Sequence, residues 1–202
     1  EIIYGTSWEN SDFGMLYWVN NGENTGKPKW VGEDVRKVTP VVLERPDGTT
    51  YETHIADGLI CDATATKISP SGKWIASTYR TEENKQAIKK IQKAAFYNTE
   101  TETTTIVEDY GESMGMYVTD DGIAFIAIGT YASTSSVVYD LNTGTDLGDM
   151  ADWIKNNYGI IVPDGNISRI TPDGSCVLGF SPLASASGVN FFWWYIAPPL
   201  EE

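Results

Sequence analysis

A short turn pattern that occurs three times constrains the fold of this chain more than any other feature. Each copy consists of an apolar residue, a hydroxyl residue, two turn-forming residues and a glycine: Ile68–Gly72, Val118–Gly122 and Ile170–Gly174. The three glycines, at positions 72, 122 and 174, recur at intervals of 50 and 52 residues. A fixed period of this size is typical of folds built by stacking copies of one structural unit.

The residues that follow each turn predict strands. An apolar run comes directly after each glycine, and a second run that contains aromatic residues comes later in the unit. The first runs are Trp74–Ala76, Ala124–Ala127 and Cys176–Gly179, and the second are Ala95–Tyr97, Val137–Tyr139 and Phe191–Tyr195. Pro, Asp and Ser favour turns, Gly favours positive φ, and β-branched and aromatic residues favour strands. Four short strands in about 50 residues are typical of a β-propeller blade. A β-sandwich with accidental self-similarity is the alternative.

The period predicts an all-β fold, a partial β-propeller of about three to four blades of four-stranded antiparallel sheet. We expect one module over residues 1–202: a partial blade 1–65 with an extra hairpin, a blade 66–109, a blade 110–166 and a partial blade 167–202. Glu1 aligns with the residue after a turn glycine. We therefore expect the remaining blades to come from upstream sequence or from a partner chain.

Two short helices are predicted in insertions. Thr81–Gln92 has apolar residues at helical spacing among lysines, which is typical of a solvated helix or, alternatively, of a basic patch for an anionic partner. Asp149–Tyr158 is the second, with Asp149 as its N-cap and Gly159 after its end.

Composition excludes several functions. The chain has 28 acidic and 14 basic residues and a net charge of −14, which disfavours binding to a nucleic-acid backbone. It contains no apolar run long enough for a transmembrane span. One histidine and two distant cysteines provide no usual zinc set, and the Asp-Gly pairs are interpreted as turns and not as calcium loops. We therefore expect no metal and no cofactor.

Gly111–Gly115 matches the Gly-x-Ser-x-Gly motif of serine hydrolases. That motif requires a turn from a strand into a helix and a histidine later in the chain. Here a strand-forming run follows, and the only histidine, His54, lies upstream. We interpret the segment as a loop between blades and predict no catalytic residues. A pair of acids for glycoside hydrolysis stays open, so enzymatic activity is undecided, with binding favoured.

A candidate ligand-binding face follows from the blade topology. In a propeller, the loops from second to third strands and the loops between blades share one face. The candidate residues on or beside these loops are Trp8, Phe13, Tyr79, Arg80, Tyr110, Glu112 and Tyr131. Exposed aromatic rings beside acidic residues suit sugar or peptide recognition. The alternative is that these aromatic residues pack between blades.

The turn motif carries a family resemblance. Ile68–Ala76 resembles the Ser-Pro-Asp-Gly-Lys repeat of TolB-type and prolyl-oligopeptidase-type propellers. Asp149–Lys155 and Ile167–Gly179 together resemble bacterial extracellular repeats named for a His-Ala-Phe tripeptide, and Ala95–Tyr97 would be that tripeptide without its histidine. The resemblance implies a secreted or outer-membrane surface protein of Gram-negative bacteria, in some cases lipid-anchored, and implies no activity.

The functional hypothesis is a non-catalytic, extracellular or cell-surface propeller module that binds a protein, a peptide or a glycan. One alternative is the gating or substrate-binding propeller of a hydrolase or lyase whose catalytic residues lie outside this chain. Another is a structural accessory subunit of an outer-membrane complex.

Overall fold

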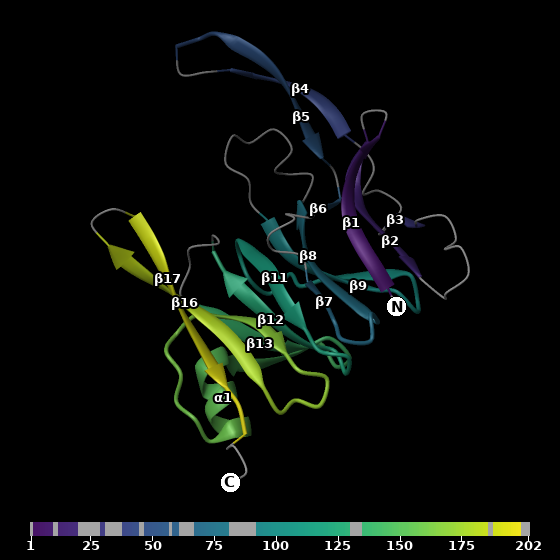
Figure 1. Cartoon of the computed structure of the whole chain (residues 1–202). Coiled ribbons are helices and arrows are strands. Elements are labelled where there is room, and N and C mark those ends of the chain that lie inside the picture. The colour runs from purple at the N-terminus through teal and green to yellow at the C-terminus, as the bar shows by residue number, and fades with distance from the viewer. Residues whose placement is uncertain are drawn as a thin grey trace.

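The computed structural model describes residues 2–9, 12–19, 29–30, 38–44, 47–56, 58–60, 67–80, 92–129, 135–185 and 188–198. Its strands form four antiparallel sheets and one separate hairpin (Figure 1). The first sheet contains β1 (Ile2–Glu9), β2 (Asp12–Val19) and β3 (Lys29–Trp30). The second contains β6 (Gly58–Ile60), β7 (Lys67–Ile68), β8 (Trp74–Arg80), β9 (Gln92–Asn98) and β10 (Thr103–Ile106). The third contains β11 (Ser113–Val118), β12 (Ile123–Ile128), β13 (Ser136–Asp140) and β14 (Thr145–Asp149).

The fourth sheet has three strands, β15 (Asn166–Ile170), β16 (Val177–Ser185) and β17 (Gly188–Ile196). The separate hairpin pairs β4 (Val38–Glu44) with β5 (Thr50–Ala56), and it is the extra hairpin expected in residues 1–65. In the second sheet both β6 and β7 pair with β8, so two short segments together flank that strand.

The three repeated turns are structurally equivalent, as the sequence predicted. Gly72, Gly122 and Gly174 have φ values of 82°, 87° and 71°, in the left-handed region that glycine adopts most readily. In each turn the glycine N–H donates to the carbonyl of the hydroxyl residue three positions earlier, at 2.9, 3.1 and 2.8 Å. The turns connect β7 to β8, β11 to β12 and β15 to β16, the same two strands of three successive sheets.

Successive sheets stack face to face through apolar side chains. Between the second and third sheets the buried residues include Ala76, Phe96, Ala124 and Ile126. Between the third and fourth they include Tyr117, Phe125, Val138, Val177 and Trp194. Alternate residues of β12 thus face opposite neighbours, because side chains along a strand alternate between the two faces of its sheet. Burial of the third sheet on both faces is the packing of a propeller blade, and it excludes a two-sheet sandwich. The chain is an all-β, partial β-propeller.

Helix α1 (Met150–Tyr158) lies between the third and fourth sheets in the chain. The Asp149 side chain accepts hydrogen bonds from the N–H groups of Ala151 and Asp152, and Gly159 ends the helix at a φ of 69°. Ile154 is fully buried against the third and fourth sheets. The second predicted helix is therefore confirmed, whereas residues 81–91 of the first lie outside the described residues and Gln92 begins β9. Within the described part of the chain, no helix is long and apolar enough to cross a membrane.

Two predicted loops are strands in the structure. Ser113–Gly115, interpreted as part of a loop between blades, form the first half of β11. Much of the loop expected between the runs Cys176–Gly179 and Phe191–Tyr195 continues β16 and β17, which pair as far as Ser185 opposite Gly188. In both places ladder hydrogen bonds to a neighbouring strand satisfy the backbone, and that pairing outweighs the weak local preferences of Ser, Ala and Gly.

Candidate functional site

The described residues of the predicted binding face lie at or beside the ends of strands. Trp8 pairs with Phe13 across β1 and β2. Tyr79 pairs with Lys93 across β8 and β9, and Arg80 is the last residue of β8. The structure describes only the backbone of Trp8, Phe13 and Arg80, and Tyr131 lies outside the described residues.

Three members of this face have described side chains, and all three are half-buried: Tyr79, Tyr110 and Glu112. The Tyr110 ring meets Tyr139 edge-on, with ring centroids 6.5 Å apart, and the Nζ of Lys93 donates to the Tyr110 carbonyl. Burial raises the pKa of the Tyr110 hydroxyl, and the negative charge of the nearby Asp146 raises it further. The Tyr110 hydroxyl has no hydrogen-bond partner among the described residues. Lys93 pairs with Tyr79 and also contacts Tyr110, so these two residues lie near one another. A ligand-binding role for the seven candidate residues stays a prediction.

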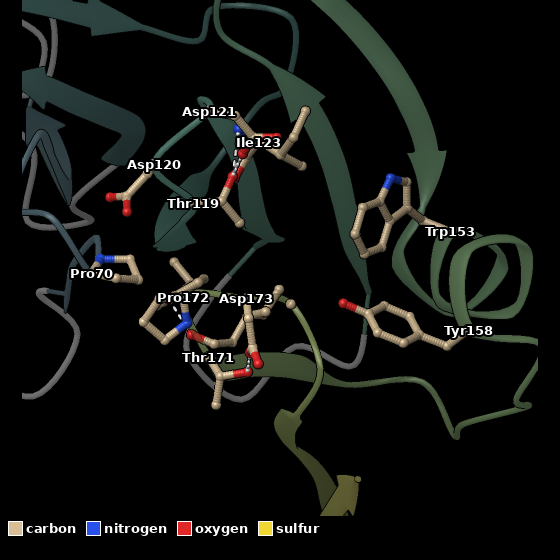
Figure 2. Close-up of a pocket in the computed structure, with 13 residues that line it drawn as sticks. Pro70, Thr119, Asp120, Asp121, Ile123, Trp153, Tyr158, Thr171, Pro172 and Asp173 are labelled. Carbon is tan, nitrogen blue, oxygen red and sulfur yellow. Dashed lines mark hydrogen bonds between the residues drawn. The ribbon is translucent and has the colours of Figure 1, made fainter. Parts of the chain in front are cut away.

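A cavity of about 340 Å³ opens where the three repeated turns converge (Figure 2). The first turn contributes Pro70, the second Thr119, Asp120 and Asp121, and the third Thr171–Gly174. Helix α1 contributes Trp153 and Tyr158 from the other side, as Figure 2 shows. Tyr117, Ile123 and Ile170 complete the lining. The cavity therefore belongs to the repeat architecture, because it lies where equivalent bends of adjacent sheets meet.

Hydrogen bonds between sheets fix the turns around the cavity. Ser71 donates to Asp120 through its N–H at 2.9 Å and through its hydroxyl at 2.6 Å. The Tyr117 hydroxyl donates to the Ile170 carbonyl at 2.9 Å. Although burial favours the neutral form of Asp120, hydrogen bonds from Ser69 and Ser71 outweigh it and lower the pKa of this carboxyl. Each turn is thus tied to the turn of the neighbouring sheet.

The aromatic wall of the cavity is held from behind. Trp153 packs edge-on against Phe125 of β12, with ring centroids 5.3 Å apart, and lies 6.2 Å from the Tyr158 ring. Phe125 is fully buried, so it gives Trp153 a rigid base. Burial raises the pKa of Tyr158, which therefore keeps its proton at neutral pH. The result is a half-exposed aromatic wall of two rings, inclined to each other by 58°, on the side of the cavity opposite the turns.

The serine of the Gly-x-Ser-x-Gly motif lies within a sheet and does not line the cavity. Ser113, the serine of the Gly-x-Ser-x-Gly motif, is fully buried in β11, and its Oγ accepts a hydrogen bond from the Ala94 N–H at 3.0 Å. It serves sheet stacking and does not face the cavity. Among the residues that the structure describes, no three His, Cys, Asp or Glu side chains gather as metal ligands would.

Fold and site together define a partial β-propeller with an aromatic and acidic cavity on its turn face. No protein-family model matches the chain, and no curated protein matches it. Solved structures that it resembles include TolB from Acinetobacter baumannii, with 15% identity over 96% of this chain and 40% of TolB and a TM-score of 0.42. Others are hydrazine synthase from Kuenenia stuttgartiensis (9% identity, 88% and 42% of the two chains, TM-score 0.38) and a protein from Lactobacillus plantarum (15%, 97% and 68%, TM-score 0.34). The chain spans about two fifths of the length of TolB and of the hydrazine synthase chain.

Sequence reasoning missed the cavity, although it identified several of its residues. The Asp-Gly pairs were interpreted only as turn formers, and the helix at Asp149–Tyr158 was assigned no part in a site. The available signal was the repeat itself. Equivalent turns of adjacent blades lie at the same end of the propeller, so Asp121 and Asp173 had to share a face.

Proposed function

We propose that the chain is a non-catalytic propeller module that binds a protein, a peptide or a glycan outside the cell. The observation that carries the proposal is the turn-face cavity, in which Trp153 and Tyr158 face Asp121 and Asp173. A few aromatic groups with convergent polar side chains are the usual composition of a ligand pocket. The extracellular or outer-membrane location rests on the family resemblance of the repeats.

Peptide and glycan arrays probed with the purified chain test this function. We expect a defined subset of ligands to bind, and Trp153→Leu to abolish that binding because it removes the stacking surface. Asn156→Ala is the matched control, since Asn156 is an exposed residue of the same helix that does not line the cavity. Equal binding by both variants would place the ligand elsewhere, and no binding on any array would count against the function.

A second feature supports a role within a larger assembly. Ala76 pairs with Phe96, Phe125 with Val138, and Leu178 with Tyr195, at equivalent positions of the second, third and fourth sheets. Phe96 and Val138 are 0% exposed because the next sheet covers them, whereas Tyr195 is 79% exposed. Trp193 and Phe191 lie on the same face and are also exposed.

We propose that a further β-sheet covers this face, from other residues of the same protein or from a partner chain. The proposal extends the packing seen within the chain, where the second sheet buries an apolar face against the third and the third buries one against the fourth. The accessory-subunit alternative has the same requirement. Cross-linking in cells of a chain that carries a photoreactive residue at position 195 tests the proposal. A cross-link to another polypeptide segment is expected. Reaction of the photoreactive group at position 195 with water alone would contradict the proposal.

A further inference from the structure

The turn-face cavity is negatively charged, and its charge is not neutralised by its own lining. Asp120, Asp121 and Asp173 contribute carboxylates, and none of the described residues that line the cavity is a lysine or an arginine. Lys73 and Arg169 lie near the lining, where their charges act on Asp120 and Tyr117 respectively. The Asp120 carboxylate is occupied by Ser71. Asp121 and Asp173 are both exposed and line the cavity, so their carboxylates are accessible to a ligand in the opening. A concave surface with charge of one sign attracts ligands of the opposite sign.

Each of these two carboxylates retains a free oxygen. Thr119 Oγ1 donates to the Oδ1 of Asp121. Thr171 Oγ1 donates to the Oδ1 of Asp173 at 2.6 Å, and the Ser175 N–H and hydroxyl donate to the same atom at 3.1 and 2.8 Å. In both residues Oδ2 accepts no hydrogen bond from the described part of the chain. The turns therefore orient the two carboxylates and leave one acceptor on each.

Hydrogen bonds from Thr171 and Ser175 lower the pKa of Asp173 to about 2. Its carboxylate is consequently charged at every physiological pH. Opposite it lie the rings of Trp153 and Tyr158, as Figure 2 shows. An aromatic face attracts a cation through its quadrupole, and tryptophan does so most strongly. Aromatic rings on one side and free carboxylate oxygens on the other are complementary to a flat cation.

We propose that the cavity binds the guanidinium group of an arginine side chain in a peptide or protein partner. A guanidinium is planar, stacks on aromatic rings and donates hydrogen bonds to carboxylates in a fixed geometry, whereas a lysine ammonium is a compact, strongly hydrated charge. A neutral sugar would stack on Trp153 but would leave the charge of Asp121 and Asp173 unneutralised. The inference rests on the proposed binding function and assigns its ligand class.

Isothermal titration of the 202-residue chain with matched peptides tests the inference. The probes are Gly-Gly-Arg-Gly-Gly, the same peptide with lysine, and the same peptide with citrulline, an uncharged isostere of arginine. We expect the arginine peptide to bind most tightly. Citrulline should weaken binding about tenfold or more, because it removes the charge and keeps the shape. Added salt should weaken binding of the arginine peptide and leave the citrulline peptide unaffected.

Variants link the binding to the cavity. Asp121→Asn and Asp173→Asn preserve size and remove one charge each, and both should weaken arginine binding severalfold. Asp164→Asn, an exposed acid outside the cavity, is the matched control and should leave it unchanged. Circular dichroism of each variant verifies the fold, and Trp153→Phe, which keeps a ring, should retain more binding than Trp153→Leu.

The outcomes separate this inference from the function on which it rests. Equal binding of arginine and citrulline peptides, or no binding of any of the three, overturns the arginine assignment. If oligosaccharides bind instead and Trp153→Leu removes that binding, the binding function stands and the ligand class is a glycan. If Asp164→Asn weakens arginine binding as much as Asp173→Asn, the attraction is only the net charge of −14, and the cavity is not the site.

Discussion

The Tyr117 hydroxyl, at the end of the third sheet, donates a hydrogen bond of 2.9 Å to the Ile170 carbonyl in the fourth. Tyr117 is buried, and this bond joins two successive sheets. Tyr117→Phe should lower the free energy of unfolding by about 1 kcal/mol, because the Ile170 carbonyl loses its partner. Urea denaturation measures the change. Tyr158→Phe is the control, since no hydrogen bond of the Tyr158 hydroxyl joins the described residues, and an equal effect of both changes would contradict the assignment.

Close contact of inner strands predicts a steric effect at Gly115. A Cβ added at this residue would lie 2.6 Å from the Ser77 carbonyl of β8, whereas one added at Gly111 would meet nothing within 4 Å. Gly115→Ala should therefore destabilise the chain by about 1–3 kcal/mol, the usual range for overpacking, and Gly111→Ala should not. Thermal melts of the two variants make the comparison, and similar melting temperatures would mean that the sheets are further apart than described.

The turn carboxylates predict a loss of stability in acid. The pKa of Asp173 in the folded chain, about 2, lies below its ordinary value of 3.8. A lowered pKa contributes stability above the unfolded value, and protonation removes that contribution as pH falls from about 4 to 2. The lowered pKa values of Asp120 and Asp140 act in the same direction. Asp173→Asn should flatten this part of the stability curve, measured by denaturation at pH 7, 4 and 3. A curve unchanged from that of the original chain would exclude the mechanism.

Mutations at equivalent positions on two sheets should have very different effects on the stability of the chain. Phe96 is fully buried under the third sheet, so Phe96→Ala should destabilise the chain by about 3–5 kcal/mol. Tyr195 occupies the corresponding place in the fourth sheet but is 79% exposed, so Tyr195→Ala should change stability by no more than about 0.5 kcal/mol. Chemical denaturation of the isolated chain tests both. A large effect at position 195 would show that this face is already covered in solution.

The period of the turns was readable from sequence because each turn has a strict local requirement. Gly72, Gly122 and Gly174 all adopt positive φ, which few other residues tolerate. The cap of α1 was predictable for the same reason, since Asp149 and Gly159 satisfy backbone groups within a few residues of themselves. Ser113 was misplaced because its strand forms through pairing with Ile128, a partner 15 residues away.

The candidate site depended on contacts that no local pattern encodes. Asp121 and Asp173 lie 52 positions apart, and only the stacking of the third and fourth sheets brings them to one cavity. Trp153 faces them because α1 packs on Phe125. The predicted face near Tyr79 and Tyr110 came from the blade topology, and its role in ligand binding stays a prediction.

The repeating unit, its turns and the all-β architecture follow from local sequence, because propensities and turn geometry act over a few residues. Which side chains are covered and which converge depends on the packed fold. Burial and cavity shape depend on how neighbouring sheets pack, and at equivalent positions that packing buries Phe96 and leaves Tyr195 exposed.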